Sequence, residues 1–305
     1  MQFMNLDKVS AQLDVEKLYS KSNIKKAIRK DIEETEELME KVAQGVELLE
    51  EYVSQEYYDS KNRRIAYFST LDFEEIVMDV FIVTIQLDKP MLFTNIVGQL
   101  AESLGFTVKG DGVKTIAEVL AILCETDVYD IFKDEKYDSL KIKSNYGLPD
   151  QLLRFIHQTK YLPPMICNPK TVYKNSDSAY LSTKSSLILG RGTYHNEEIC
   201  LDSINKFNQI PLTLNVELLK TYSEEPTSPA ILEDADKYRQ WEEMVRDSYV
   251  VYKDLVKQGN HFYLTHKVDK RGRTYSQGYH LSTQANSFRK AIIDLAEKEI
   301  IEGFM

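Results

Sequence analysis

Hydrophobic residues recur every three or four positions in the first half of the chain, which is the spacing of one helical face. Between residues 23 and 54 this pattern predicts one long helix, with an apolar stripe of Ile32, Met39, Val42, Val46, Leu49 and Val53. Glutamates fill many of the positions around the stripe. Packing of the stripe against its own domain is favoured, with a short coiled coil or a partner-facing helix as the alternatives.

Further helical patterns follow this first one. Residues 73–84 and 94–104 each carry an apolar helical face. Residues 115–118 read Thr-Ile-Ala-Glu, the spacing of a capping box, which would open a helix that runs to Cys124. We therefore expect a helical N-terminal domain over residues 1–158.

The pattern changes after Lys160, because Pro163 and Pro164 lack the backbone donor that a helix needs. A helix is again predicted over residues 232–257, and residues 261–275 have strand character around a charged turn. The expected fold class is mainly α with a small β component. Beyond the N-terminal domain we divide the chain into residues 159–223, a connecting region, 224–259, a short helical region, and 260–305, a mixed segment.

The charge is distributed unevenly. A net charge of −10 in 305 residues argues against nucleic acid as a partner. Six cations and one aspartate between residues 260 and 290, however, give this segment +5 and leave −15 for the rest. A local basic segment in an acidic protein indicates a phosphate-bearing ligand at that segment.

Several classes of protein are disfavoured by composition. No apolar run approaches the roughly 20 residues of a membrane-spanning helix, so we expect no membrane partner. The first ten residues lack the apolar core of a secretory signal. Three cysteines without metal-type spacing favour reduced, buried thiols in the cytoplasm.

Other candidate sites have simpler structural explanations. Asp234 and Asp236 have the spacing of a metal-binding pair, but carboxylates are also favoured in the first turn of a helix. The five histidines form no metalloprotease motif, and Gly190-Arg191-Gly192 lacks the other residues of a phosphate loop. We therefore predict neither a catalytic nor a metal-binding residue in this chain.

The segment from Asp269 to Tyr275 is the strongest candidate site. On a strand, Arg271 and Arg273 would place both guanidinium groups on one face, about 6–7 Å apart, and such groups bind phosphate through two parallel hydrogen bonds. Gly272 would let a sugar or base approach, Asp269 would orient one arginine, and Tyr275 would pack against a sugar or base. An exposed charged hairpin without a ligand explains the same residues equally well.

Residues 268–297 resemble the Asp-x-x-Gly-Arg segment of the single-subunit RNA polymerases of phages and mitochondria, in which a strand and loop at the start of the palm lead into a helix. Residues 161–165 and 204–215 resemble two further segments of that family. The resemblance implies a right-hand polymerase with an N-terminal domain. The later regions would be residues 159–223, template-proximal, 224–259, a short thumb-like helix region, and 260–305, the first palm segment.

This resemblance also implies roles for individual residues. Arg271 and Arg273 would grip the backbone of the template or the RNA–DNA hybrid, supported by Asp269, Gly272 and Tyr275. The remaining nucleic-acid-binding positions would be Gln284 and Lys290 in the same groove and Asn286 and Arg289 beside it. Secondary template-proximal positions would be Arg191, Asn208 and Asn215.

The family's metal-binding aspartates and fingers residues have no counterpart up to Met305. The resemblance therefore implies the small subunit of a split, heterodimeric phage DNA-directed RNA polymerase, a nucleotidyltransferase of transcription that acts in the host cell cytoplasm and is inactive alone. A second subunit would supply palm, fingers, the carboxylates that hold Mg²⁺ and the site for nucleoside triphosphates. Residues 299–305 would end a palm helix with exposed apolar surface. The alternatives are a non-catalytic DNA- or RNA-binding accessory protein and a fragment of a longer polymerase.

Overall fold

The computed structural model describes residues 2–190 and 194–298, the first five of them by their backbone alone. The chain divides into two compact units. The helical unit comprises Lys21–Ile156, and the hairpin unit comprises Met1–Ser20 together with His157–Met305. The described residues are mainly helical, as the sequence predicts. No helix among them has the length and apolar character needed to cross a bilayer.

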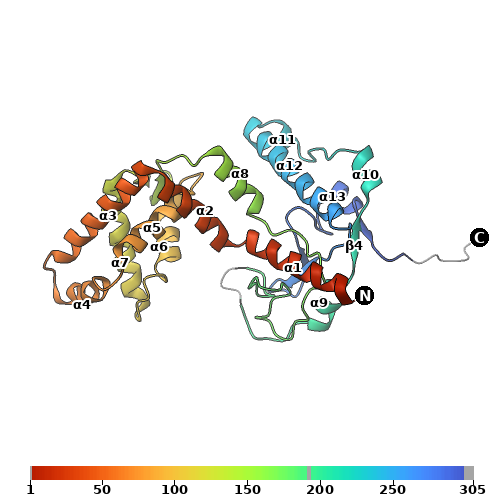
Figure 1. Cartoon of the computed structure of the whole chain (residues 1–305), viewed down its shortest axis with the longest axis horizontal. Helices are drawn as coiled ribbons and strands as arrows, with labels where there is room; N and C mark the ends of the chain where they lie inside the picture. Colours follow the sequence, from red (N-terminus) through yellow and green to blue (C-terminus); the bar gives the residue numbers. More distant parts are fainter. Residues whose placement is uncertain (1, 191–193, 299–305) are drawn as a thin grey trace, which may run out of the picture. The chain divides into compact units, whose positions relative to one another are not determined.

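The helical unit combines six α-helices, α2 to α7 (Figure 1), with a small antiparallel sheet. The strand order of this sheet is β1-β3-β2. Its helices are α2 (Lys21–Glu34), α3 (Glu36–Ser54), α4 (Asp59–Phe68), α5 (Phe73–Ile85), α6 (Phe93–Leu100) and α7 (Lys109–Leu123), which runs into the 3-10 turn η1 (Cys124–Thr126). Its strands are β1 (Met91–Leu92), β2 (Tyr129–Asp134) and β3 (Ser139–Ser144). Helix α8 (Asp150–Thr159) begins in this unit and ends in the other.

Helix α5 forms the centre of the helical unit. Every residue from Val80 to Ile85 is buried, and α5 contacts α2, α3, α6 and β3. The second half of this helix, apolar except for Thr84, is therefore enclosed on all sides. Gly45 of α3 permits the close approach to α5, because a Cβ atom there would lie 2.8 Å from Cγ1 of Val77.

The helices begin and end differently from the predicted ones. The stripe over residues 23–54 is divided between α2 and α3, because Thr35 adopts an extended conformation and its hydroxyl donates to the carbonyl of Asp31. The predicted capping box is wrong, since α7 already begins at Lys109 and Thr115 lies buried inside it. The hairpin of β2 and β3 was not predicted.

The hairpin unit contains helices, two antiparallel pairs of short strands and isolated strand bridges. Its helices are α1 (Gln2–Leu18), α9 (Leu201–Asn208), α10 (Val216–Thr221), α11 (Pro229–Leu232), α12 (Ala235–Lys257) and α13 (Ser287–Ala291). Strand β4 (Leu212–Leu214) pairs with β7 (Ile293–Leu295), and β5 (Thr265–Val268) pairs with β6 (Thr274–Gln277), both antiparallel. An antiparallel bridge joins Met165 to Tyr263 and so places the proline-containing segment beside the residues that precede β5.

Two buried polar side chains of helix α1 bind it to the rest of the hairpin unit. Glu16 is 1% exposed and accepts hydrogen bonds from the backbone N–H groups of Leu181, Ser182 and Thr183 at 2.6–2.8 Å. Gln12 accepts one from the N–H of Ile166 at 2.9 Å. Burial alone would raise the pKa of Glu16, but these hydrogen bonds outweigh it and the pKa is lowered. The helical unit therefore begins at Lys21, and its bounds differ from the residues 1–158 predicted for the N-terminal domain.

As far as residue 298, the C-terminal segment has less helix than a palm strand followed by a palm helix would have. Helix α13 has five residues, and the chain then enters β7. Residues 299–305, for which an exposed apolar helix end was predicted, lie outside the described residues.

Candidate nucleic-acid interface

The predicted basic segment forms the turn between β5 and β6. Val268 pairs with Thr274, and the five residues 269–273 connect them. Gly272 has a φ of +81°, in the left-handed region that glycine adopts without a steric penalty. The sequence pattern predicted that the two arginines lie two positions apart on a single strand. They flank the turn residue Gly272 and do not share a strand. The reversal of the chain at Gly272 separates their backbones instead.

Asp269 organises the turn. Its Oδ1 accepts hydrogen bonds from the backbone N–H groups of Arg271 and Arg273 at 2.8 and 3.0 Å. Its Oδ2 accepts from Nε and Nη2 of Arg271 at 2.9 and 2.7 Å, and from the hydroxyl of Tyr275 at 3.3 Å. Partial desolvation would raise the pKa of Asp269, but hydrogen bonds from the backbone and from Arg271 lower it to about 2. The carboxylate is therefore ionised at neutral pH and orients Arg271, as expected.

The turn presents cations to the solvent. Lys270, Arg271 and Arg273 are all exposed, and Asp269 is the one carboxylate among residues 269–273. On the strands behind them, Lys267 lies opposite Tyr275, so these two side chains share a face of the hairpin. Burial lowers the pKa of Lys267. The exposed end of the hairpin thus carries three cations against one anion.

Side-chain amides cover both edges of the hairpin. Asn208 Oδ1 accepts from the backbone N–H of His266 at 2.9 Å, on the outer edge of β5. Gln284 accepts from the N–H of Ser276 at 3.2 Å and donates to the carbonyl of Thr274 at 3.0 Å, on the outer edge of β6. Gln284 thus takes the place of a neighbouring strand beside β6. On the outer edge of β5, Asn208 does so at His266, whereas Val268 pairs with the backbone of Leu187 and Leu189. Such capping of open edges limits unwanted strand pairing.

This arrangement changes the interpretation of several predicted positions. Asn208 is 1% exposed, so the structure does not place it on a template-binding surface. Gln284 is exposed, but its amide is engaged with β6. Asn215 caps α10 by accepting from the N–H of Leu218 at 3.0 Å. Arg191 lies outside the described residues.

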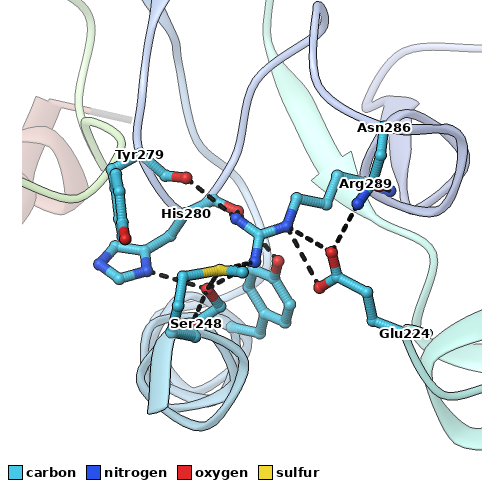
Figure 2. A network of polar contacts seen from close by, with 8 residues as sticks. Glu224, Ser248, Tyr279, His280, Asn286 and Arg289 are labelled. Carbon is cyan, nitrogen blue, oxygen red and sulfur yellow. Dashed lines mark hydrogen bonds and ion pairs between the residues drawn. The ribbon is translucent and has the colours of Figure 1, made fainter. Parts of the chain in front are cut away.

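Arg289 lies inside the hairpin unit, at the centre of a polar network (Figure 2). Its Nε donates to both carboxylate oxygens of Glu224, at 2.9 and 3.2 Å, and the two side chains are 6% and 0% exposed. Nη1 donates to the backbone carbonyls of Tyr279 at 3.0 Å and His280 at 3.4 Å, while Nη2 contacts the hydroxyl of Ser248 and the sulfur of Met244. Arg289 is therefore a structural residue here, and it is not on the surface that the sequence analysis assigned to it.

Two neighbours of Arg289, Asn286 and Lys290, differ in whether their side chains are engaged inside the unit or exposed to solvent. Asn286 caps the helix by accepting from the N–H of Arg289 at 2.9 Å, and its amide donates to Glu224 at 2.7 Å. Lys290, the next residue, is exposed. Of the predicted set, the structure brings Asp269, Arg271, Gly272, Arg273 and Tyr275 together in the hairpin, with Gln284 along its edge. Glu224 was missed because its partners lie more than 60 residues further along the chain.

The cysteines and acidic groups add no second site. Cys167 is buried, and that burial raises its pKa to about 11. Cys124 is only half-buried and Cys200 is exposed, so the expectation of three buried thiols holds for Cys167 alone. Within the described part of the chain, no three His, Cys, Asp or Glu side chains gather as a metal site would need.

Comparison with known proteins gives an independent finding. A probable DNA-directed RNA polymerase from Gelasinospora sp. (strain G114) is 27% identical to the chain over 217 residues, which cover 65% of the chain and 24% of the relative. The chain is thus similar to a DNA-directed RNA polymerase. It spans about a quarter of the length of that relative. No family model matches the chain.

Proposed function

We propose that this chain is the part of a DNA-directed RNA polymerase that holds the template DNA and the RNA–DNA hybrid. The turn at residues 269–273 would contact the phosphate backbone. The observation that carries the proposal is the cluster of three exposed cations, ordered by Asp269, in a chain whose net charge is −10. The similarity to a probable DNA-directed RNA polymerase supports it.

The geometry of the turn suits phosphate recognition. Asp269 fixes Arg271 through Nε and Nη2, which reduces the conformational entropy that this side chain would lose on binding. A guanidinium group presents a planar fork that matches two phosphate oxygens. Arg273 and Lys270 would contact adjacent phosphates of the same strand. Lys290, exposed on α13, is the remaining predicted cation that is available on the surface.

Nucleotidyl transfer requires carboxylates that hold two divalent ions beside the attacking and leaving oxygens. The proposal assigns these carboxylates, the Mg²⁺ that they hold and the nucleoside triphosphate site to a second polypeptide, as in a split phage polymerase. Co-purification from the native source should then yield the chain together with that polypeptide. RNA synthesis should require both, and synthesis by the purified chain alone would contradict the assignment.

The phosphate contact is tested by the affinity of the chain for a fluorescein-labelled RNA–DNA hybrid, measured by anisotropy at several salt concentrations. Loss of one charge-assisted hydrogen-bonding group costs about 1.5–3 kcal/mol, so Arg273→Ala should weaken binding at least tenfold. The slope of log affinity against log salt concentration should become shallower by about one, which is the contribution of one phosphate contact. Arg239→Ala is the matched control, because Arg239 is an exposed arginine of α12 that pairs with Asp236. Equal effects of the two substitutions would refute the phosphate contact.

A further inference from the structure

A cavity of about 320 Å³ lies against one face of the β5–β6 hairpin. Its walls come from α9 and the residues after it, from both strands of the hairpin, from the loop at 283–284 and from β7. The lining is largely apolar, with Leu212 on β4, Leu264 directly before β5 and Phe207 on α9. This volume is at the small end of the range for ligand pockets, so it suits one small ring system.

We propose that this cavity receives a single unstacked nucleobase from the strand whose phosphates contact the turn. The inference rests on the proposed function and extends it from the backbone of the strand to one of its bases. The ligand would be single-stranded nucleic acid, or a frayed end of a hybrid, since a paired base cannot leave its stack without cost.

The position of the cavity on the hairpin supports this inference. His266 is directly paired with Ser276, and Val268 with Thr274, so these residues share one face of the hairpin. His266, Thr274 and Ser276 line the cavity. Thr274 directly follows Arg273. Since a strand rises about 3.3 Å per residue, the cavity begins one residue away from the cationic turn. A nucleotide whose phosphate contacts Arg273 could therefore reach the cavity with its base.

The chemistry of the lining favours a neutral aromatic ring. The ring of Phe207 is 46% exposed and lies 5.4 Å from the ring of His266, so the two provide an aromatic wall. Aromatic side chains and histidine are the usual stacking partners of unpaired bases. Burial lowers the pKa of His266 to about 4, so the imidazole is neutral at pH 7. A neutral, apolar cavity disfavours a phosphate or carboxylate, which leaves the phosphates to the turn.

The hydrogen bonds of His266 determine which nitrogen of its neutral ring carries the proton. Asn208 Oδ1 accepts from the backbone N–H of His266 at 2.9 Å and also lies 3.0 Å from Nδ1 of the same residue. Because that oxygen is an acceptor, Nδ1 must carry the proton. In the neutral ring, Nε2 is then an acceptor.

Two fluorescein-labelled strands of 12 nucleotides test the inference: oligodeoxyadenylate, and a strand of the same length with abasic sites throughout. Both carry the same phosphates, so a difference in affinity reports the bases. Stacking of one base contributes a factor of roughly 5 to 150, and we expect the chain to prefer the adenylate strand by about tenfold. Phe207→Ala should remove most of this preference. Arg273→Ala should lower the affinity for both strands by the same factor.

Two more variants keep the test decisive. Thr283→Phe places a ring at the exposed rim of the cavity and should also abolish the preference, without removing any buried side chain. Tyr173→Ala is the control, because Tyr173 is a 79% exposed aromatic residue of the same unit and does not line the cavity. Equal binding of the two strands by the unmodified chain, or a preference that survives both cavity variants, overturns the base pocket and leaves the proposed function standing. Absence of binding to either strand overturns both.

Discussion

Removal of the Arg289 guanidinium should destabilise the hairpin unit strongly and should do so through Glu224. The carboxylate of Glu224 is 0% exposed and receives two hydrogen bonds from Arg289. Arg289→Met approximately conserves the side-chain volume. Of the two side chains that donate to the Glu224 carboxylate in Figure 2, it leaves the amide of Asn286. Breaking a buried ion pair by removing one partner costs about 3–5 kcal/mol, because the other charge is left uncompensated. We expect a loss in this range in the free energy of unfolding.

The double variant Glu224→Gln/Arg289→Met separates the charge effect from the packing effect. With no buried charge left, the desolvation penalty disappears, and replacement of both partners is often close to neutral. The double variant should therefore recover at least half of the stability that the single variant loses. Lys290→Met is the control, since Lys290 is exposed on the same helix and surface substitutions usually change stability by less than about 0.5 kcal/mol.

Trp241 provides the assay. It is the one tryptophan of the chain and lies on α12, the helix that contributes Met244 and Ser248 to the network. Its fluorescence during urea denaturation therefore reports on the hairpin unit. A loss below about 1 kcal/mol in Arg289→Met, or a double variant no more stable than the single one, would refute the reasoning.

Three further outcomes follow from buried contacts. Burial and the nearby Arg289 lower the pKa of His280 to about 4, so the unfolded state binds its proton more readily. The contribution of His280 to stability is fully present above pH 6.5 and should fall by about 1–1.5 kcal/mol at pH 5.5. His266, whose pKa is also lowered to about 4, adds a similar fall, so His280→Gln should show a clearly smaller loss in urea titration than the unmodified chain. Glu16→Gln removes the charged acceptor of three backbone N–H groups and should lower the stability of this contact by about 2–3 kcal/mol. Proteolysis near residues 181–183 should then be faster, and an unchanged cleavage rate would argue against this role of Glu16. Gly45→Ala should cost about 1–3 kcal/mol of the helical unit, because its Cβ would crowd Val77; an unchanged melting temperature by circular dichroism would show that α3 can shift freely.

Local features of this protein could be predicted from the sequence. The turn at residues 269–273 was visible because charged residues and a glycine interrupt alternating strand residues, and its neighbours are hydrogen-bonded within a few positions. The helix over residues 73–84 was visible because its apolar residues recur at helical spacing. In the structure, nine residues of α5 are buried. Both signals are contained in one short stretch of sequence.

Long-range contacts could not be predicted in the same way. The burial of Arg289 depends on Glu224, which lies 65 positions away and appears in the sequence as part of a polar linker. The docking of α1 depends on Glu16 and backbone groups more than 160 positions away. The pairing of β4 with β7 joins two strands of three residues, too short to show an alternating pattern.

The central claim is that the turn of the β5–β6 hairpin lies against the nucleic-acid backbone. Site-specific photocrosslinking tests it most directly: a benzophenone side chain is placed at Lys270 in one variant and at Lys257 in another, both exposed, and each is irradiated with a labelled RNA–DNA hybrid. The account predicts a strong crosslink from position 270, competed by unlabelled hybrid and reduced by high salt, and little or none from position 257. Equal crosslinking from the two positions, or none from position 270 under conditions where the hybrid binds, would contradict it.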